Sequence, residues 1–417
     1  MKRFLPLLIL PLLIWVSCEE ESPEEIETNL ITATFKNGFC LPDFNSFLVV
    51  SDEDGEILAD TSFQGDVSFN LRTDENVNAP DKINITLIRM TEWGTLAVTT
   101  NLSIDKGANW TWDNPYHDEP ESQGSSYYTF SNVSENNVSR VVLSSKGFYY
   151  RTTVDNTSST YSLNHYHTTE DVSIMAYKED GTAIYTILED VQIEQTYNVD
   201  LSTFLPATYK IITNSTGEEC DNITLHGYDA DDSVIRYNRH RFTDRGYVDG
   251  GGWNANRDFF VNYPSEFSKF GTQITVGQYA VVGEKDWYQR TFGDIPESVE
   301  KINADISVVK SDPLDFEVST SGVFDQCFVQ FDDSLSNSYW TFYVNPNISS
   351  GSILIMPSSV YAEYPELSGA YFKMRSVGVS DYLCVDSYQE WLELYFSTDG
   401  YYGDFCPEYR SVGYRVY

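Results

Sequence analysis

The chain is built from short runs in which apolar and polar positions alternate. Val, Ile, Thr, Tyr and Phe dominate these runs, and Asp, Asn, Gly and Ser separate them. Clear examples lie at 46–60, 82–93, 171–187, 339–346, 351–357 and 391–400. A period of two is typical of strands that bury one face, and closely spaced turn residues join such strands into antiparallel sandwiches. The best helix candidate, 386–396, fits a strand as well. We therefore predict an all-β fold of tandem antiparallel β-sandwich domains.

Two segments, 47–61 and 173–187, share one pattern. In each, an apolar run enters a turn that ends Glu-Asp-Gly, and a second apolar run leaves it. Gly55 and Gly181 are predicted to take the positive φ that hairpin turns need. The paired runs resemble the hairpins of Ig-like or carboxypeptidase-regulatory-like sandwich modules. Duplication of a module and chance recurrence of hairpins both explain the repeat.

The chain has 417 residues, which is more than one hydrophobic core normally supports. A linker is expected at 113–126, where Pro, Gly, Ser and acidic residues concentrate. Further breaks are expected near 201–210 and 310–316. The predicted units are a signal peptide at 1–17, a tether at 18–28, and four β-rich domains at 29–114, 126–205, 206–312 and 313–417.

The first residues indicate where the protein is directed in the cell. A basic start at 1–3 precedes an apolar run at 4–16, and Ser17 and Cys18 follow this run. The run is shorter than the roughly 20 apolar residues of a membrane-spanning helix, so it fits a secretory signal. The cysteine after a small residue resembles the lipobox of bacterial lipoproteins, although Trp15 stands where Leu is usual. The resemblance implies that Cys18 becomes the acylated first residue and holds the protein to outer-membrane lipid. An ordinary cleaved signal is the alternative.

An acidic, Pro-containing stretch follows Cys18 and extends to residue 28. Such a composition cannot bury apolar area and is expected to form a flexible tether. Its place directly after the cysteine resembles the export signal of Bacteroidota-type surface lipoproteins, which implies display on the cell exterior. A plain spacer has the same composition.

Charge and motifs restrict the function. The formal net charge is −37, from 26 basic and 63 acidic side chains, and this argues against a nucleic-acid partner. The sequence contains no GxSxG elbow, no HExxH helix and no Walker loop. It contains no CxxC spacing either. We therefore expect a protein that is not an enzyme and that has no obligatory cofactor.

The cysteines allow one specific pairing prediction. Cys384 and Cys406 are the closest pair in the sequence, so they are the disulfide candidate. The connectivity of Cys40, Cys220 and Cys327 stays open. Once the lipidated cysteine is set aside, an odd number remains, and at least one thiol is unpaired unless it bonds to another chain.

Two segments offer possible metal ligands. His165 and His167 would share one face of a strand, and Glu170 or Asp171 would complete a zinc site. Two exposed histidines on a Tyr-rich strand are the simpler alternative. In the Gly-rich segment 249–258, three oxygen-bearing side chains alternate in a way that suits Ca²⁺, although long β-loops have the same composition. These residues are Asn254, Asn256 and Asp258.

Basic and aromatic side chains supply the remaining candidates. A basic cluster in an otherwise acidic chain would recognise a carboxylate or phosphate, or would neutralise neighbouring acids. It comprises Arg236, Arg239, His240, Arg241 and Arg245. Aromatic rings expected in loops would form a platform for sugars or protein partners, or would pack in sandwich cores. They are Trp110, Trp112, Tyr116, Trp253, Trp287 and Tyr288.

Three functions follow from these features. The first is a surface protein for binding, adhesion or scaffolding that contacts a partner protein through loop aromatics. The second is a glycan-capturing lipoprotein of an outer-membrane uptake system. The third is a surface hydrolase with an unrecognised carboxylate pair.

Overall fold

The computed structural model describes residues 28–417 except 74–78, 115–120, 147, 155–158, 229–238, 245–257, 279–280, 334, 369 and 398–405. This part of the chain is mostly β-strand, with two short α-helices, and its sheets pack as several sandwiches. The prediction of an all-β, multi-domain sandwich fold is confirmed. No helix among these residues is long and apolar enough to cross a membrane.

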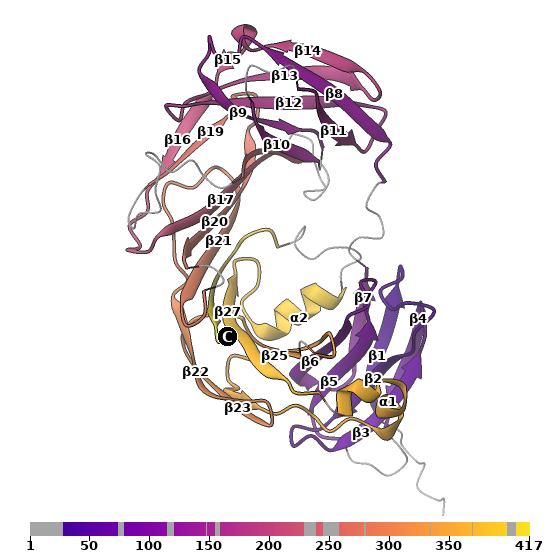
Figure 1. The fold of residues 1–417 in the computed structure, drawn as a ribbon. Helices are drawn as coiled ribbons and strands as arrows, with labels where there is room; N and C mark the ends of the chain where they lie inside the picture. Colours follow the sequence, from indigo (N-terminus) through magenta and orange to yellow (C-terminus); the bar gives the residue numbers. More distant parts are fainter. Residues whose placement is uncertain are drawn as a thin grey trace, which may run out of the picture.

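A twelve-stranded sheet connects the parts of the molecule (Figure 1). In spatial order its strands are β18 (Arg239–Asp244), β17 (Cys220–Tyr228), β20 (Lys269–Gly277), β21 (Lys285–Gly293), β28 (Tyr409–Arg415), β27 (Lys373–Tyr382), β24 (Gln326–Asp333), β25 (Ser338–Val344), β6 (Leu96–Asp105), β5 (Lys82–Met90), β2 (Ser46–Ser51) and β3 (Ile57–Phe63). β25 lies parallel to β6, with Trp340 beside Val98. The N-terminal and C-terminal parts of the chain therefore share one sheet.

A three-stranded sheet covers one face of the long sheet near β2 and β5. Its strands are β4 (Val67–Arg72), β1 (Asn29–Lys36) and β7 (Ala108–Asp113). The core between them also receives Trp391, Leu392 and Phe396 from the helix α2 (Tyr388–Ser397). We call this unit the first sandwich.

The opposite face of the long sheet has its own cover. It consists of β22 (Ala304–Asp312), β23 (Asp315–Gly322), β26 (Ser350–Gly351), the helix α1 (Ser358–Glu363) and the 3₁₀ turn η2 (Pro365–Ser368). Leu48 of β2 faces the core of the first sandwich, whereas Phe47 faces this second core. Burial on both faces explains the continuous apolar run of β2.

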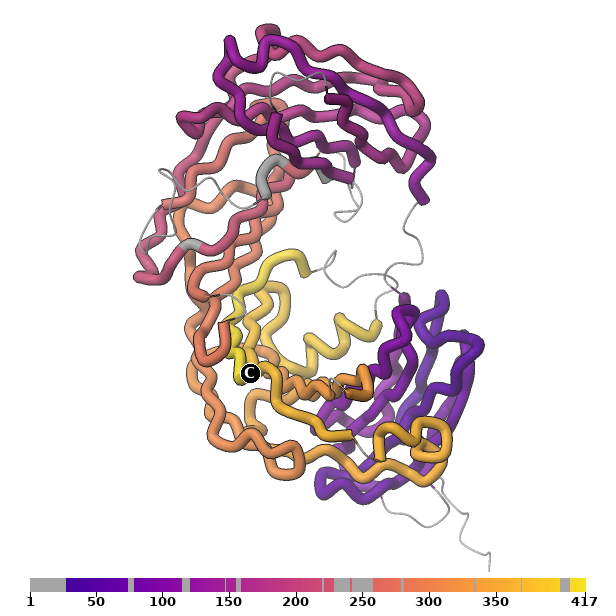
Figure 2. The backbone as a smooth tube through the Cα atoms, in the orientation of Figure 1, coloured from indigo at the N-terminus to yellow at the C-terminus, as the bar shows by residue number. Residues whose placement is uncertain are grey.

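Residues 124–206 form the second sandwich, which lies at the opposite end of the curved chain from the first (Figure 2). One sheet contains β10 (Tyr149–Thr153), β9 (Val138–Ser144), β12 (Thr169–Lys178), β13 (Ala183–Gln192) and β15 (Leu205–Pro206). The other contains β11 (Tyr161–His165), β8 (Gly124–Ser131) and β14 (Thr196–Asp200), which precedes the 3₁₀ turn η1 (Leu201–Thr203). A further core joins the five-stranded sheet to β17, β20 and the pair β16 (Thr208–Ile212) and β19 (Phe259–Tyr263).

The expectation of a strand at 391–400 is wrong, because residues 388–397 form α2. Tyr388, Trp391, Leu392 and Phe396 are its buried residues, and spacings of three, one and four place them on one helical face. The glycine prediction is confirmed: φ is 89° at Gly55 and 86° at Gly181, each in the turn of an antiparallel hairpin.

Two expected domain boundaries fall inside elements of the fold. The boundary after residue 205 divides β15. The boundary after residue 312 lies in the turn between β22 and β23, which pair along their length. The residues expected to form a C-terminal domain, 313–417, contribute β24, β25, β27 and β28 to the long sheet. The expected unit at 126–205 nearly coincides with the second sandwich at 124–206, whereas the break at 312 marks a turn between two paired strands of one sheet.

Candidate functional site

A cavity of about 300 Å³ opens at one end of the first sandwich, between the long sheet and the edge made by β7 and α2. We call it the mouth pocket. Its walls come from the loop after β1, the β5–β6 hairpin, β25, β7 and α2. The lining residues used below are Phe39, Arg89, Thr91, Glu92, Trp93, Ala97, Thr99, Asp113, Asn114, Tyr339, Thr341, Tyr343 and Tyr395.

The pairing of β5, β6 and β25 sets the shape of the floor. Ala97 of β6 lies between Arg89 of β5 and Tyr339 of β25 in one row across the strands. In the next row, Thr99 lies beside Thr341. Small side chains therefore occupy the middle of the floor, and longer ones rise at its sides.

Arg89 is held in place on one side of the pocket. Its guanidinium lies 4.1 Å from the ring centroid of Phe39, and Nη1 donates a hydrogen bond of 3.0 Å to the Phe39 carbonyl oxygen. The planar guanidinium has five N–H donors. The remaining donors are thus presented with a fixed orientation.

Trp93 lies at the tip of the β5–β6 hairpin and is 76% exposed. The turn beneath it is well fixed: the Gly94 N–H donates to the Thr91 carbonyl (2.9 Å), and φ of Gly94 is 70°. Asn337 Nδ2, from the turn before β25, donates to the Gly94 carbonyl at 3.2 Å. A rigid turn therefore presents a large apolar ring to solvent at the pocket rim.

Tyrosines form much of the opposite side. Burial raises the pKa of Tyr339, and it raises the pKa of Tyr343 well above its ordinary value. Both phenols therefore keep their protons at neutral pH and can donate hydrogen bonds. Asp113, at the end of β7, accepts a 2.8 Å hydrogen bond from Asn37 Nδ2, so this carboxylate too has a fixed orientation.

Trp110 and Trp112 were expected in a loop, and this expectation is wrong. They lie on β7 with 2% and 5% exposure, and the Trp110 ring stacks on Phe396 of α2 at 4.0 Å. Trp112 stacks on Phe35 of β1 at 4.7 Å and also contributes to the wall of the mouth pocket. Both rings are core residues whose burial fixes the position of α2.

Trp287 and Tyr288 also lie on a strand, β21, and not in a loop. Lys301 Nζ is 3.7 Å from a Trp287 ring centroid, and the Tyr288 ring stacks on Tyr409 at 5.2 Å. Neither lines the mouth pocket. Trp253, Tyr116, Arg236 and Arg245 lie outside the described residues.

The described part of the basic cluster lies on β18. Arg239 is in this strand, and nothing more is described of its side chain. The Arg241 N–H donates to Ser144 Oγ at 2.7 Å, and the Arg241 guanidinium lies 4.0 Å from the Tyr149 ring centroid. Arg241 therefore links the edge of the long sheet to the second sandwich.

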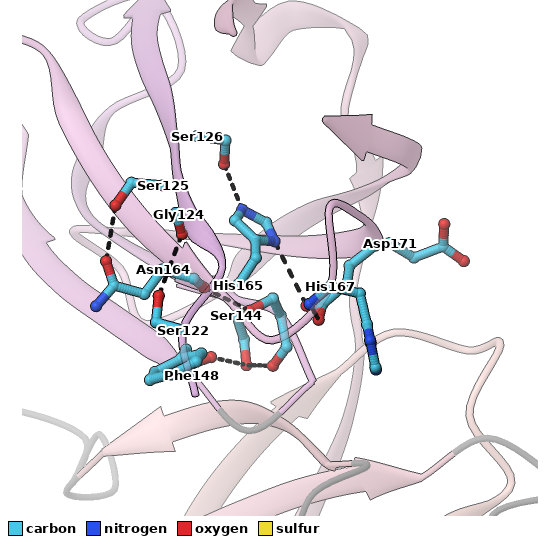
Figure 3. A network of polar contacts seen from close by, with 12 residues as sticks. Ser122, Gly124, Ser125, Ser126, Ser144, Phe148, Asn164, His165, His167 and Asp171 are labelled. Atoms are coloured by element: carbon cyan, nitrogen blue, oxygen red, sulfur yellow. Dashed lines mark hydrogen bonds and ion pairs between the residues drawn. The ribbon is translucent and has the colours of Figure 1, made fainter. Parts of the chain in front are cut away.

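His165 and His167 do not share a strand face. β11 ends at His165, which is fully buried, whereas His167 is exposed in the following bend. Figure 3 shows the His165 ring between Ser126 and the segment that carries His167. Ser126 Oγ lies 2.6 Å from His165 Nε2, and Glu170 Oε2 lies 3.4 Å from His165 Nδ1. We call Ser126, His165 and Glu170 the buried cluster.

The connectivity of the buried cluster is that of a nucleophile, a base and an orienting carboxylate. Its surroundings do not fit catalysis, because Ser126 and His165 are both 0% exposed and Glu170 is 6% exposed. The Ser126 hydroxyl also donates to the Tyr128 hydroxyl at 2.6 Å, so its proton is directed away from the histidine. Glu170 Oε1 accepts the His167 N–H at 2.7 Å. The cluster therefore connects β8, β11 and β12 as a structural network.

Metal and thiol sites were also expected from the sequence. Across the described ranges, no group of three or more His, Cys, Asp or Glu side chains is arranged to hold a metal ion. Asn254 and Asn256 lie outside these ranges, and Asp258 accepts the Asn214 N–H at 3.0 Å.

The structure joins Cys384 to Cys406, the pair that the sequence singled out. Cys40 and Cys327 are free and buried, and burial raises the pKa of their thiols to about 11 and about 12. Such thiols stay protonated at neutral pH and are poor nucleophiles. Cys220 begins β17, and Cys18 lies outside the described residues.

Comparison with known proteins adds little. No family model and no curated protein match the chain. Among solved structures, the chain is similar to the Bacillus anthracis TIE protein, with 13% identity and a TM-score of 0.15. The match covers 69% of this chain and 57% of that protein.

Proposed function

We propose that the protein is a non-catalytic surface lipoprotein, held to the outer membrane through acylated Cys18, that binds a ligand in the mouth pocket. The observation that supports binding is the pocket itself. It combines aromatic rings with a few oriented polar groups in a concave space, as small-molecule sites generally do. Its volume lies at the small end of the ~300–1,000 Å³ range of such sites.

The position of the anchor is compatible with this function. β1 begins at Asn29, directly after the tether, and ends at Lys36, three residues before Phe39 of the pocket. At ~3.3 Å per residue, the strand separates the tether from the pocket by about 23 Å. An anchored protein would thus carry its pocket away from the point of attachment.

A second candidate function is docking of a partner protein. A groove of about 770 Å³ next to β26 and α1 is lined mostly by apolar residues, with Ser311, Asp312 and Lys373 among them. Leu314, Ile355 and Tyr371 on its walls are 70%, 81% and 69% exposed. Contiguous exposed apolar surface of this kind is typical of interaction sites. This observation favours the adhesion hypothesis and does not involve the mouth pocket.

Display is tested by protease treatment of intact cells that produce the native protein, a Cys18→Ala variant or a variant with residues 19–21 changed to Ala. We expect the native protein to be cleaved from outside, and the acidic-tether variant to be retained but protected. Native protein that resists protease while cell-surface controls are cleaved would contradict surface display.

Binding is tested by thermal-shift screening of a mixed library of sugars, amino acids, nucleosides and peptides. A ligand at 100 times its Kd stabilises the folded state by about 2.7 kcal/mol. The stabilising compound is then tested on a Trp93→Ala/Tyr339→Ala variant. We expect the shift to disappear in this variant. A compound that stabilises both proteins equally binds elsewhere and would count against the mouth pocket.

A further inference from the structure

The chemistry of the mouth pocket restricts the class of ligand, and the inference that follows rests on the proposed binding function. The first restriction is shape. Arg89 and Tyr339 lie two strands apart with Ala97 between them, which sets their Cα atoms about 10 Å apart. Only a methyl group rises from the floor between them. The resulting slot suits a single six-membered ring of the size of a pyranose.

The second restriction is the mixture of polar groups. Thr91, Thr99 and Thr341 contribute hydroxyls that both donate and accept, and Arg89 contributes donors. Asp113 and Asn114 contribute acceptors on the opposite wall. A purely apolar ligand would displace water from the Thr99 and Thr341 hydroxyls and from the Arg89 guanidinium without replacing its hydrogen bonds, at a cost of about 1–3 kcal/mol for each group left unsatisfied. A ligand with many hydroxyls would satisfy them.

The third restriction is charge. The lining carries both signs of charge: Arg89 repels a cation that contacts it, although Glu92 and Asp113 attract one, so no charged ligand is favoured by every group. Glu92 and Asp113 in the lining, and the net charge of −37 on the whole chain, oppose an anion. An uncharged polar ligand meets neither repulsion.

The fourth restriction is the exposed indole of Trp93. It offers an apolar face at the rim, above polar walls, and a turn that is hydrogen-bonded on both sides holds it there. The C–H face of a sugar ring packs on such a surface, while the hydroxyls around the ring edge reach the walls. We infer that the mouth pocket binds an uncharged carbohydrate of one or two pyranose units in the slot between Arg89 and Tyr339, with a C–H face on Trp93 at the rim and its hydroxyls on Arg89 and the threonines.

The test measures binding by calorimetry to the full chain, purified in a detergent without a sugar headgroup. The probes are neutral glucose-, galactose-, mannose- and N-acetylglucosamine-based disaccharides, a sialylated and a glucuronic-acid-containing oligosaccharide, and choline. We expect a neutral disaccharide to bind and the charged probes to fail. Trp93→Ala and Tyr339→Ala should each weaken binding at least ten-fold, which corresponds to about 1.4 kcal/mol.

Two further variants serve as controls. Trp93→Phe keeps a ring and should recover most of the affinity, which separates loss of stacking from loss of folding. Tyr371→Ala removes an equally exposed ring from the other groove and should leave binding unchanged.

The outcomes distinguish the assignment of the ligand class from the proposal that the mouth pocket binds a ligand. Binding of an acidic oligosaccharide that Trp93→Ala abolishes would overturn the assignment to an uncharged ligand, and binding of choline that Trp93→Ala abolishes would overturn the carbohydrate assignment. Either result would leave the mouth pocket as a binding site. A neutral sugar that binds all variants equally would overturn both statements. Failure of every probe here, together with failure of every compound in the mixed library, would overturn the proposed function itself.

Discussion

The two sandwiches place the same kinds of polar side chain in opposite environments, one open to solvent and one buried. At the mouth of the first, Arg89, Asp113 and several hydroxyls line an open cavity beside an exposed tryptophan. In the second, Ser126 Oγ and Glu170 Oε2 lie 2.6 Å and 3.4 Å from the two ring nitrogens of His165, yet all three side chains are buried. The cluster that looks most like an active site is therefore the one that no substrate can reach.

Access to solvent, and not residue type, decides what each polar cluster does. A buried polar group must be satisfied internally, so its partners are part of the fold. A polar group on a cavity wall exchanges water for ligand at little cost to folding. Substitutions in the buried cluster should consequently reduce stability and leave binding intact, and substitutions in the mouth pocket should do the reverse.

The largest effect on stability is expected from Glu170→Ala. This change removes the acceptor of the His167 N–H and the buried carboxylate beside His165 Nδ1, and each buried polar group left unsatisfied costs about 1–3 kcal/mol. Urea unfolding measures the loss. Asp171→Ala is the neighbouring control, since Asp171 is exposed and accepts a single N–H from Asp190. A loss below about 1 kcal/mol for Glu170→Ala, the net value of an ordinary hydrogen bond, would argue against a structural network.

A slightly smaller effect is expected from removal of the disulfide, with Cys384→Ser and Cys406→Ser combined. The bond closes a loop of 22 residues that contains α2, and loop-closure entropy gives about 3 kcal/mol. Because Tyr395 and Phe396 of α2 line the mouth pocket, ligand affinity should fall as well. Removal of the disulfide is therefore expected to lower both the stability of the fold and the affinity for ligand. Wild-type protein unfolded in reductant is the control and should match the variant.

Asp325 is a buried carboxylate, and none of its described contacts is a cation. It extends the contrast between buried and accessible polar groups to a single charge. Burial, and then Asp381, Asp386 and Glu390, raise its pKa to about 6, although the Tyr382 N–H donates to it at 2.7 Å. The folded state therefore binds a proton more tightly than the unfolded chain, and stability falls as pH rises from about 4 to about 6. A shift of about two pKa units corresponds to about 3 kcal/mol as an upper value.

Asp325→Asn keeps an acceptor for the Tyr382 N–H and removes the charge. We expect this variant to be more stable than the wild type by up to about 3 kcal/mol at pH 7.5 and nearly equal to it at pH 4. Chemical unfolding at the two pH values measures the difference. Asp54→Asn, in the exposed β2–β3 turn, is the control and should change stability by less than about 0.5 kcal/mol at either pH. A gain that does not depend on pH would show that charge burial is not the cause.

The sequence predicted the strands and hairpins because period-two alternation and turn glycines are local signals. It left α2 open between a helix and a strand, because a run such as Trp391-Leu392-Glu393-Leu394 fits both periods over so short a length. The mouth pocket could not be predicted, because its floor depends on the pairing of β6 with β25, whose partners are about 240 residues apart in sequence. The tryptophans show the same limit. Trp110 and Trp93 have equally polar neighbours, and only the position of a second sheet decides which one is buried.

The smallest effect on stability is expected from Trp93→Ala, and it completes the contrast with the buried cluster. The side chain is 76% exposed, and the turn that holds it is fixed by backbone and Asn337 hydrogen bonds that do not involve the indole. The free energy of unfolding should therefore change by less than about 0.5 kcal/mol. The measurement is urea unfolding without ligand, followed by the same titration with a saturating neutral sugar. We expect the sugar to stabilise the wild type and not the variant, because the indole contributes to the ligand and not to the fold. A loss of about 2 kcal/mol or more without ligand, which is the value of a buried ring, would place Trp93 with the core tryptophans and contradict the contrast with the buried cluster.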